Sequence, residues 1–304
     1  MKTRRTETHL TPAALVSHTM IRIQGEQEGD IAVFHACSPN ARLRLQWGGI
    51  LMTMLSAQAC QGVLEGFSAA RSAMTLIPRL IPTPPPAAAD PFALPTVAID
   101  WTRRPAYAVV PRQELSRDRS RQVKWLDLHM GPVTFQILDQ AGCAGAVELL
   151  HTAHRRRLHA AAEHLAVIHS STERRACYPQ PRIAGPASWC SGRTIADKSV
   201  RTSEEAPVSV PWSLTTTAPI RIDTTMGTAD SHDAAVTAVL VAAHDAITAA
   251  EFSAAPHCRY ELRAGGDLVA VIQTGADEDG RPDHASTRAL IQRIEWQRYL
   301  SSSQ

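Results

Sequence analysis

The residue types that could carry chemistry are present, but they do not converge on one reaction. The chain has no G-x-x-x-x-G-K-[ST] or G-x-G-x-x-G phosphate-binding motif, no G-x-S-x-G nucleophile elbow and no H-E-x-x-H metal helix. The nearest metal-like pattern is His159 with Glu163 and His164. Residues five apart lie about 140° around a helix, so these two imidazoles would not share a metal ion. We therefore expect no metal and no cofactor.

The six cysteines favour packing over catalysis. Cys177 and Cys190 are separated by twelve residues without a Cys-x-x-Cys pair, which is not a recognised zinc-ligand spacing. Cys60 and Cys143 fall on the apolar faces of two predicted helices, where a thiol is expected to be buried and unreactive. The sequence shows no secretion signal, so we expect reduced thiols and a soluble cytoplasmic protein.

Basic residues gather in two stretches that could contact phosphates. One stretch lies within residues 103–124 and the other covers 155–157. The candidate nucleic-acid contacts are Arg117, Arg119, Arg121, Lys124, Arg155, Arg156 and Arg157. Cations also favour the C-terminal part of a helix, and no helix-turn-helix or zinc finger accompanies these residues. The formal net charge of +2 gives no global field that attracts nucleic acid.

The most promising interaction surface is the polar face of two predicted strands. In residues 42–47 and 125–130 polar side chains alternate with apolar ones, the period of a half-buried strand. A sheet with a helix on one side leaves its other face open, and Trp and Arg often anchor interfaces. The expected partner-binding residues are Arg42, Arg44, Gln46, Trp125, Asp127 and His129. Face-to-face packing of the two sheets and a merely hydrated face are the alternatives.

These two strands belong to what we interpret as two copies of one unit. The segment LRLQWGGILMTMLSAQACQGVLEGFSAAR (43–71) aligns with LDLHMGPVTFQILDQAGCAGAVELLHTAH (126–154). Upstream, Ile21–Gln24 aligns with Val97–Asp100. Such a repeat predicts architecture before any local argument. We expect an α+β fold made of a tandem repeat of an antiparallel four-stranded sheet plus a helix (ββββα).

The remaining elements complete this architecture. The two repeat helices are expected to begin at Ser56 and Asp139, both good N-cap residues. The C-terminal hairpin resembles the one at 43–55 through its Gly-Gly turn, which leaves open a degenerate third copy. The helix at 234–252 is short and interrupted by polar residues, which indicates a buried helix and not a membrane span. The predicted units are a first module (1–76), a stiff proline-rich linker (77–96), a second module with an extended basic helix (97–169), an irregular or disordered linker (170–218) and a smaller C-terminal αββα region (219–304).

The duplication without a converging catalytic set favours a non-enzymatic binding or scaffold protein. It would use the paired sheet faces for a protein partner or for self-association, without contact with a membrane. The first alternative is a nucleic-acid-binding accessory protein that uses the two basic stretches. A further alternative is an enzyme whose site lies between the modules, with His129 as its titrating group.

Overall fold

The structure is a computed structural model that describes residues 18–36, 38, 41–82, 97–116, 119–172, 209–253 and 255–302. Its first part contains β1 (Thr19–Ile23), β2 (Gly29–Phe34), β3 (Arg42–Trp47), β4 (Ile50–Met54), α1 (Ala57–Ala73) and the short 3-10 helix η1 (Met74–Leu76). Next come β5 (Val97–Trp101), β6 (Tyr107–Leu115), β7 (Gln122–Met130), β8 (Val133–Ile137) and α2 (Gln140–Thr172). The C-terminal part contains β9 (Val210–Ala218), β10 (Arg221–Ala229), α3 (His232–Phe252), β11 (Arg259–Ala264), β12 (Asp267–Gln273), β13 (Gly275–Ala276), β14 (Pro282–Asp283) and α4 (His284–Ser302).

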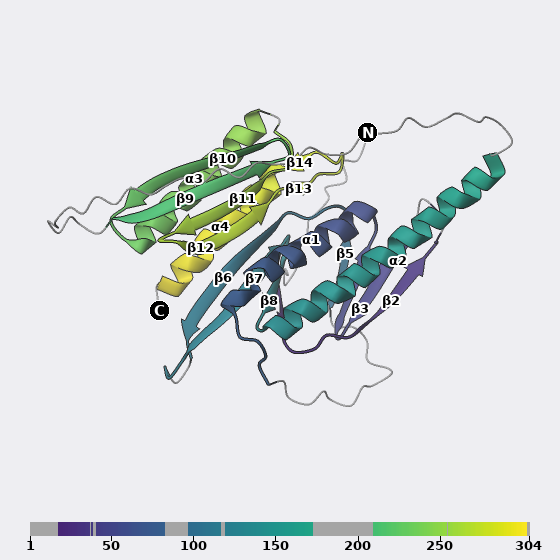
Figure 1. Cartoon of the computed structure of the whole chain (residues 1–304), viewed down its shortest axis with the longest axis horizontal. Coiled ribbons are helices and arrows are strands. Elements are labelled where there is room, and N and C mark those ends of the chain that lie inside the picture. Colours follow the sequence, from purple (N-terminus) through teal and green to yellow (C-terminus); the bar gives the residue numbers. More distant parts are fainter. Residues whose placement is uncertain are drawn as a thin grey trace, which may run out of the picture.

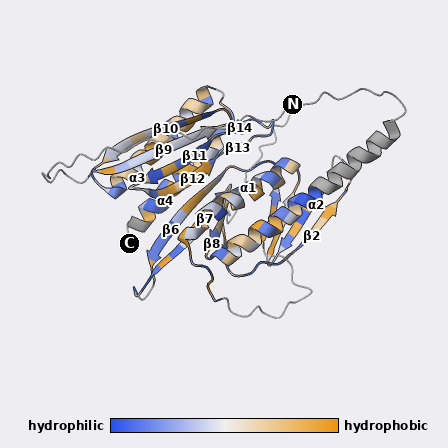
Figure 2. Ribbon diagram, viewed as in Figure 1, coloured by the Kyte–Doolittle hydropathy of each residue, from blue (hydrophilic) through white to orange (hydrophobic). Residues whose placement is uncertain are grey.

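The predicted α+β class is confirmed, and a four-stranded sheet with a helix on it is present. One sheet has the order β2-β3-β4-β5 and the other the order β1-β8-β7-β6-β12-β11-β9-β10 (Figure 1). Polar and apolar residues alternate along several of these strands (Figure 2). The expectation of purely antiparallel sheets is wrong, because β5 pairs in parallel with β4 and β1 pairs in parallel with β8. Alternation predicts a strand but does not choose its partner.

Strand β1 therefore joins the sheet that contains β8, and β5 joins the sheet that contains β4, through similar backbone hydrogen bonds. Their backbone bonds are Thr19 N to Pro132 O (2.9 Å), Leu138 N to Ile23 O (2.9 Å), Val97 N to Gly49 O (3.2 Å) and Leu55 N to Trp101 O (2.9 Å). Thr19 and Val97 thus occupy matching places. The sequence alignment set Ile21 against Val97, two residues away from Thr19, and this difference leaves the alternation of faces unchanged.

One hydrophobic core joins both sheets to α1 and α2, which lie side by side (Figure 1). The Phe67 ring on α1 lies 5.0 Å from Phe135 on β8 and 5.8 Å from Trp47 on β3, between ring centroids. The single α1 side chain therefore bridges the two sheets. Cys60 and Cys143 are fully buried in this core, as predicted.

Both predicted helix starts are confirmed. Ser56 Oγ accepts the backbone N–H of Ala59 at 3.0 Å. The fully buried Asp139 carboxylate accepts three backbone N–H groups, from Gly142 at 2.8 Å, from Gly25 at 3.0 Å and from Ile81 at 2.9 Å. Asp139 therefore fixes the turn after β1 and the segment after η1 to the start of α2.

The C-terminal part continues the larger sheet through β12, which pairs with β6. Alternate residues of β6 face opposite sides: Tyr107 and Val109 lie in the first core, whereas Ala108 and Val110 lie in a second core with α3 and α4. Helices α3 and α4 therefore cover the sheet face opposite to α1.

Two predictions for the C-terminal part are wrong. Residues 210–218, predicted to be irregular, form β9, and the region has the order ββαββββα where αββα was expected. The signal was weak because β9 is rich in Ser and Thr and buries only Leu214 fully. The other expected irregular residues, 173–208, lie outside the described part of the chain.

Helix α3 was expected to be buried, and it packs through an apolar stripe. The fully or almost fully buried stripe residues are Val236, Val239, Leu240, Ala243 and Ile247. By length and composition α3 is also the one helix among the described residues that could cross a membrane. Here its stripe lies in the second core against the sheet.

Candidate interaction site at the fork between β6 and β12

The two polar strand faces differ in their exposure to solvent. On β3, Arg42, Arg44 and Gln46 are exposed, and the guanidinium carbon of Arg44 lies 4.9 Å from the centroid of the Phe34 ring. On β7 the expected open face is covered, and Asp127 and His129 are 5% and 0% exposed. The prediction of an open second face is therefore wrong.

Helix α4 is the element that covers this second face. Arg293 donates to the backbone carbonyl of Gly131 at 2.6 Å, and Arg112 on β6 donates to the side chain of Gln297. The predicted αββα region ends in a helix, but the sequence does not indicate the surface against which that helix packs. An amphipathic helix pattern does not tell which sheet face the helix will cover.

Asp127 forms the centre of a polar network under α4. Its Oδ2 accepts Nε of Arg112 at 3.2 Å and its Oδ1 accepts Nε1 of Trp125 at 3.0 Å. Burial raises the pKa of Asp127, while Arg112 and Trp125 act in the opposite direction. Trp125 itself is only half-buried, so its indole is held in place by a buried carboxylate.

His129 is not suited to acid–base chemistry near neutral pH. Its Nδ1 lies 2.7 Å from Oγ1 of Thr134, and Nε2 has no partner among the described residues. Burial lowers the pKa of His129 to about 3, and the charges of Arg293 and Arg112 act in the same direction. The imidazole is therefore neutral at physiological pH, which weakens its proposed role as a titrating catalytic group.

A cleft opens where β6 and β12 diverge. Strand β6 pairs with β7 along its full length, but with β12 only through Tyr107–Gln273, Ala108–Ile272 and Val109–Val271. Continuing this register would place Ala270 opposite Val110. A cavity of about 920 Å³ lies there, lined by residues 110–114 of β6 and 267–269 of β12. We call this cavity the β6–β12 cleft.

The remaining walls of the β6–β12 cleft come from both halves of the chain. Strand β7 contributes Lys124 and Trp125, both predicted as contact residues. Helices α3 and α4 contribute Val236, Leu240 and Ile294. The walls are thus a mixture of apolar and polar side chains, and the two facing strand edges lack a strand partner within the described residues. Such a cleft suits an extended backbone that carries alternating apolar side chains.

The signal for this cleft in the sequence is Pro111. Proline lacks the N–H that a central strand needs, so within a strand it marks an edge. The divergence of residues 110–114 from residues 267–269 depends on the contact between distant segments. Local pattern does not contain that information.

The two basic stretches are not brought together. Arg117 lies outside the described residues, and Arg119, Arg121 and Lys124 are exposed at the β6–β7 hairpin. The second stretch contacts the smaller sheet region at the other side of the molecule (Figure 1). Its hydrogen bonds are Arg155 to Glu148 (3.3 Å), Arg156 to Ile31 O (2.9 Å) and Arg157 to Ala41 O (2.7 Å).

The cysteines and acidic residues show no reactive arrangement in the described part. Burial raises the pKa of Cys60 and of Cys143 to about 11, so both are protonated thiols at neutral pH. Cys177 and Cys190 lie outside the described residues. Within the described ranges no group of three or more His, Cys, Asp or Glu side chains is placed to hold a metal ion.

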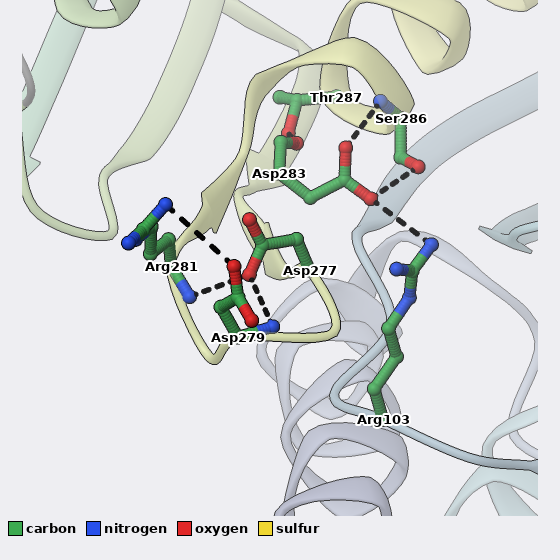
Figure 3. A network of polar contacts seen from close by, with 7 residues as sticks. All are labelled: Arg103, Asp277, Asp279, Arg281, Asp283, Ser286 and Thr287. Atoms are coloured by element: carbon green, nitrogen blue, oxygen red, sulfur yellow. Dashed lines mark hydrogen bonds and ion pairs between the residues drawn. The ribbon is translucent and has the colours of Figure 1, made fainter.

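Figure 3 shows how the start of α4 is anchored. The Asp283 carboxylate accepts the backbone N–H of Ser286 at 2.9 Å and its hydroxyl at 2.6 Å, and it forms an ion pair with Arg103 at 3.5 Å. In the adjacent acidic turn, Asp277 accepts the N–H groups of Asp279 and Arg281, as expected for a turn. This network ties α4, and with it one wall of the cleft, to the segment before β6.

Comparison of the chain with known protein families, with curated proteins and with solved structures finds no match. The interpretation of the site therefore depends on its geometry.

Proposed function

We propose that this chain is a non-enzymatic binding protein that takes an extended segment of a partner protein into the β6–β12 cleft. The observation that carries the proposal is the opening between two strand edges that face each other, about 920 Å³ in volume. An inserted strand would hydrogen-bond to both edges, the mode known as β-augmentation. Backbone bonds would supply affinity, and the apolar wall residues would select the side chains.

The chemistry of the cleft favours a segment with apolar side chains flanked by a basic residue. Trp125 presents a large ring whose position is fixed by Asp127. Leu268 and Ile294 provide further apolar surface. The charged lining residues are Arg112, Lys124, Arg298, Glu114, Asp233, Asp267 and Glu295. Acidic groups are in slight excess in this set, so a cationic segment is complementary.

We also propose that the two halves of residues 19–172 are a tandem repeat that has exchanged its first strands. The matching places of Thr19 and Val97, and of the caps Ser56 and Asp139, support this proposal. In this arrangement β2 corresponds to β6. Strand β6 pairs with β12 along part of its outer edge, whereas on β2 the carbonyl of Ile31 accepts a hydrogen bond from Arg156. The copies therefore differ at the edge where binding is proposed.

Selection from a displayed library of random nine-residue peptides tests the binding proposal. The wild type is expected to enrich peptides with alternating apolar residues. Trp125→Ala and Leu268→Asp should weaken binding of an enriched peptide at least tenfold, whereas Arg44→Ala on the exposed β3 face should leave its affinity unchanged. No enrichment, or loss of binding only in Arg44→Ala, would contradict the proposal.

The second candidate site is the exposed β3 face, as predicted from the sequence. Its support is the exposure of Arg42, Arg44 and Gln46 beside the half-exposed Phe34 ring. Arg44→Ala distinguishes the two sites, because it should weaken binding of the enriched peptide only if the peptide binds to the β3 face. The nucleic-acid alternative has less support, because Arg156 and Arg157 are already bonded to backbone carbonyls.

A further inference from the structure

The outer edge of the larger sheet is β10, a long strand with little protection. It pairs with β9 over nine residues, and in the described part of the chain it has no second strand partner. Natural edge strands are usually protected by central charges, proline or a bulge. The pairing of β10 with β9 has no bulge, and its two charged residues, Arg221 and Asp223, form an ion pair with each other at 2.6 Å.

One face of β10 is apolar as well as exposed. Leu214 of β9, which is buried in the second core, pairs with Thr225, so odd-numbered residues of β10 face α3. The even-numbered residues point to the opposite side, where Ile222 is 70% exposed and Met226 is 75% exposed. Thr224 lies between them on the same face.

We propose that β10 is a self-association edge, at which a second copy of the chain pairs antiparallel about a two-fold axis at Thr224. In this register Ile222 lies opposite the partner subunit's Met226, and Met226 lies opposite the partner's Ile222. Two exposed apolar pairs thus become cross-strand contacts, the unit that stabilises a sheet. The two eight-stranded sheets become one continuous sheet. This edge is separate from the β6–β12 cleft, so the inference does not depend on the proposed function.

The charges of β10 favour the register with its axis at Thr224 over the register with its axis at Asp223. An axis at Asp223 would place two carboxylates directly opposite each other, which is destabilising. An axis at Thr224 places Asp223 opposite the partner's Thr225 and Arg221 opposite the partner's Gly227. A two-fold pairing of this kind is closed, because each copy uses its only β10 edge and leaves no further edge of that type.

A cysteine at the axis tests the register directly. Opposed residues in an antiparallel pair have Cα atoms about 4.5–5.5 Å apart, which suits a disulfide. In a background with Cys37, Cys177 and Cys190 changed to Ser, Thr224→Cys should form a disulfide-linked dimer under mild oxidation. Thr217→Cys is the matched control, because it lies on the same face of β9, and its two copies would be farther apart than three strand spacings, which is more than about 14 Å.

Light scattering during size-exclusion chromatography provides the second measurement. The wild type at about 100 μM should have twice the 33.0 kDa chain mass. Ile222→Lys with Met226→Lys should return it to the single mass while its circular dichroism spectrum stays unchanged. A monomeric wild type, or a dimer in which Thr224→Cys is linked no better than Thr217→Cys, would overturn the inference.

Discussion

The indole Nε1 of Trp125 donates a hydrogen bond to Oδ1 of Asp127 at 3.0 Å. This bond joins an aromatic wall of the β6–β12 cleft to a carboxylate buried beneath α4. Arg112 donates to the other oxygen of the same carboxylate. The shape of the cleft is therefore set by a network inside the sheet–helix interface, and changes to that network should reach the cleft.

Asp127→Ala should destabilise the fold by about 3 kcal/mol, because it leaves the largely buried Arg112 without its carboxylate. It should also weaken peptide binding by releasing Trp125. Asp127→Asn keeps an acceptor for Trp125 and should bind more tightly than Asp127→Ala. Urea unfolding and peptide titration measure both effects. Equal stability of Asp127→Ala and the wild type would show that the network does not contribute to the free energy of unfolding.

His129 should make stability depend on pH between about 6.5 and 3. Its pKa is about 3 in the folded chain and 6.5 in the unfolded chain, so the unfolded state binds the proton over this range. Stability is fully present above pH 6.5 and is lost as the pH falls, by about 1.4 kcal/mol per unit within the range.

The measurement is urea unfolding at several pH values, with His129→Gln as the comparison. The raised pKa of Asp127 acts in the opposite direction at its own titration. The expected result is therefore stated as a difference: the wild type loses more stability than His129→Gln between pH 6.5 and 4. Parallel curves for the two proteins would show that His129 keeps an ordinary pKa.

The two helix caps should differ in their energetic weight. Asp139→Ala leaves three backbone N–H groups, those of Gly25, Ile81 and Gly142, without their acceptor and should cost about 3 kcal/mol. Ser56→Ala removes one cap bond and should cost about 1 kcal/mol. Denaturant unfolding of both variants checks the order, and a larger loss in Ser56→Ala would contradict it.

Gly275→Ala should destabilise the junction between β12 and the segment before β6. A Cβ at Gly275 would overlap the backbone nitrogen of Ala106, and backbone cannot move aside. Overpacking of this kind costs about 1–3 kcal/mol. Gly66→Ala is the matched control, because its closest neighbour is the flexible end of Met130. Thermal unfolding should show a larger decrease in Tm for Gly275→Ala than for Gly66→Ala.

The sequence predicted those features of the fold that depend on the local pattern of polar and apolar residues. Alternation in β3 and β7, the caps at Ser56 and Asp139, and the burial of Cys60 are all local consequences of side-chain periodicity. The parallel pairings of β1 with β8 and of β5 with β4 were not predicted, since strand partners are chosen by tertiary packing.

The candidate site was only partly predictable for the same reason. Trp125 was expected at a contact surface, and it lines the cleft. His129 was expected on an open strand face but is buried under α4. The position of α4 depends on contacts such as Arg293 with Gly131, which are 162 residues apart. No periodicity encodes such a contact.

Hydrogen exchange with and without an enriched nine-residue peptide tests the central claim most directly. A strand inserted between β6 and β12 would give hydrogen-bond partners to backbone amides on both edges. We expect exchange to slow in residues 110–114 and 267–269 when peptide is added, and to stay unchanged in residues 42–47. Slower exchange only at 42–47, or no change at either cleft edge, would contradict the account.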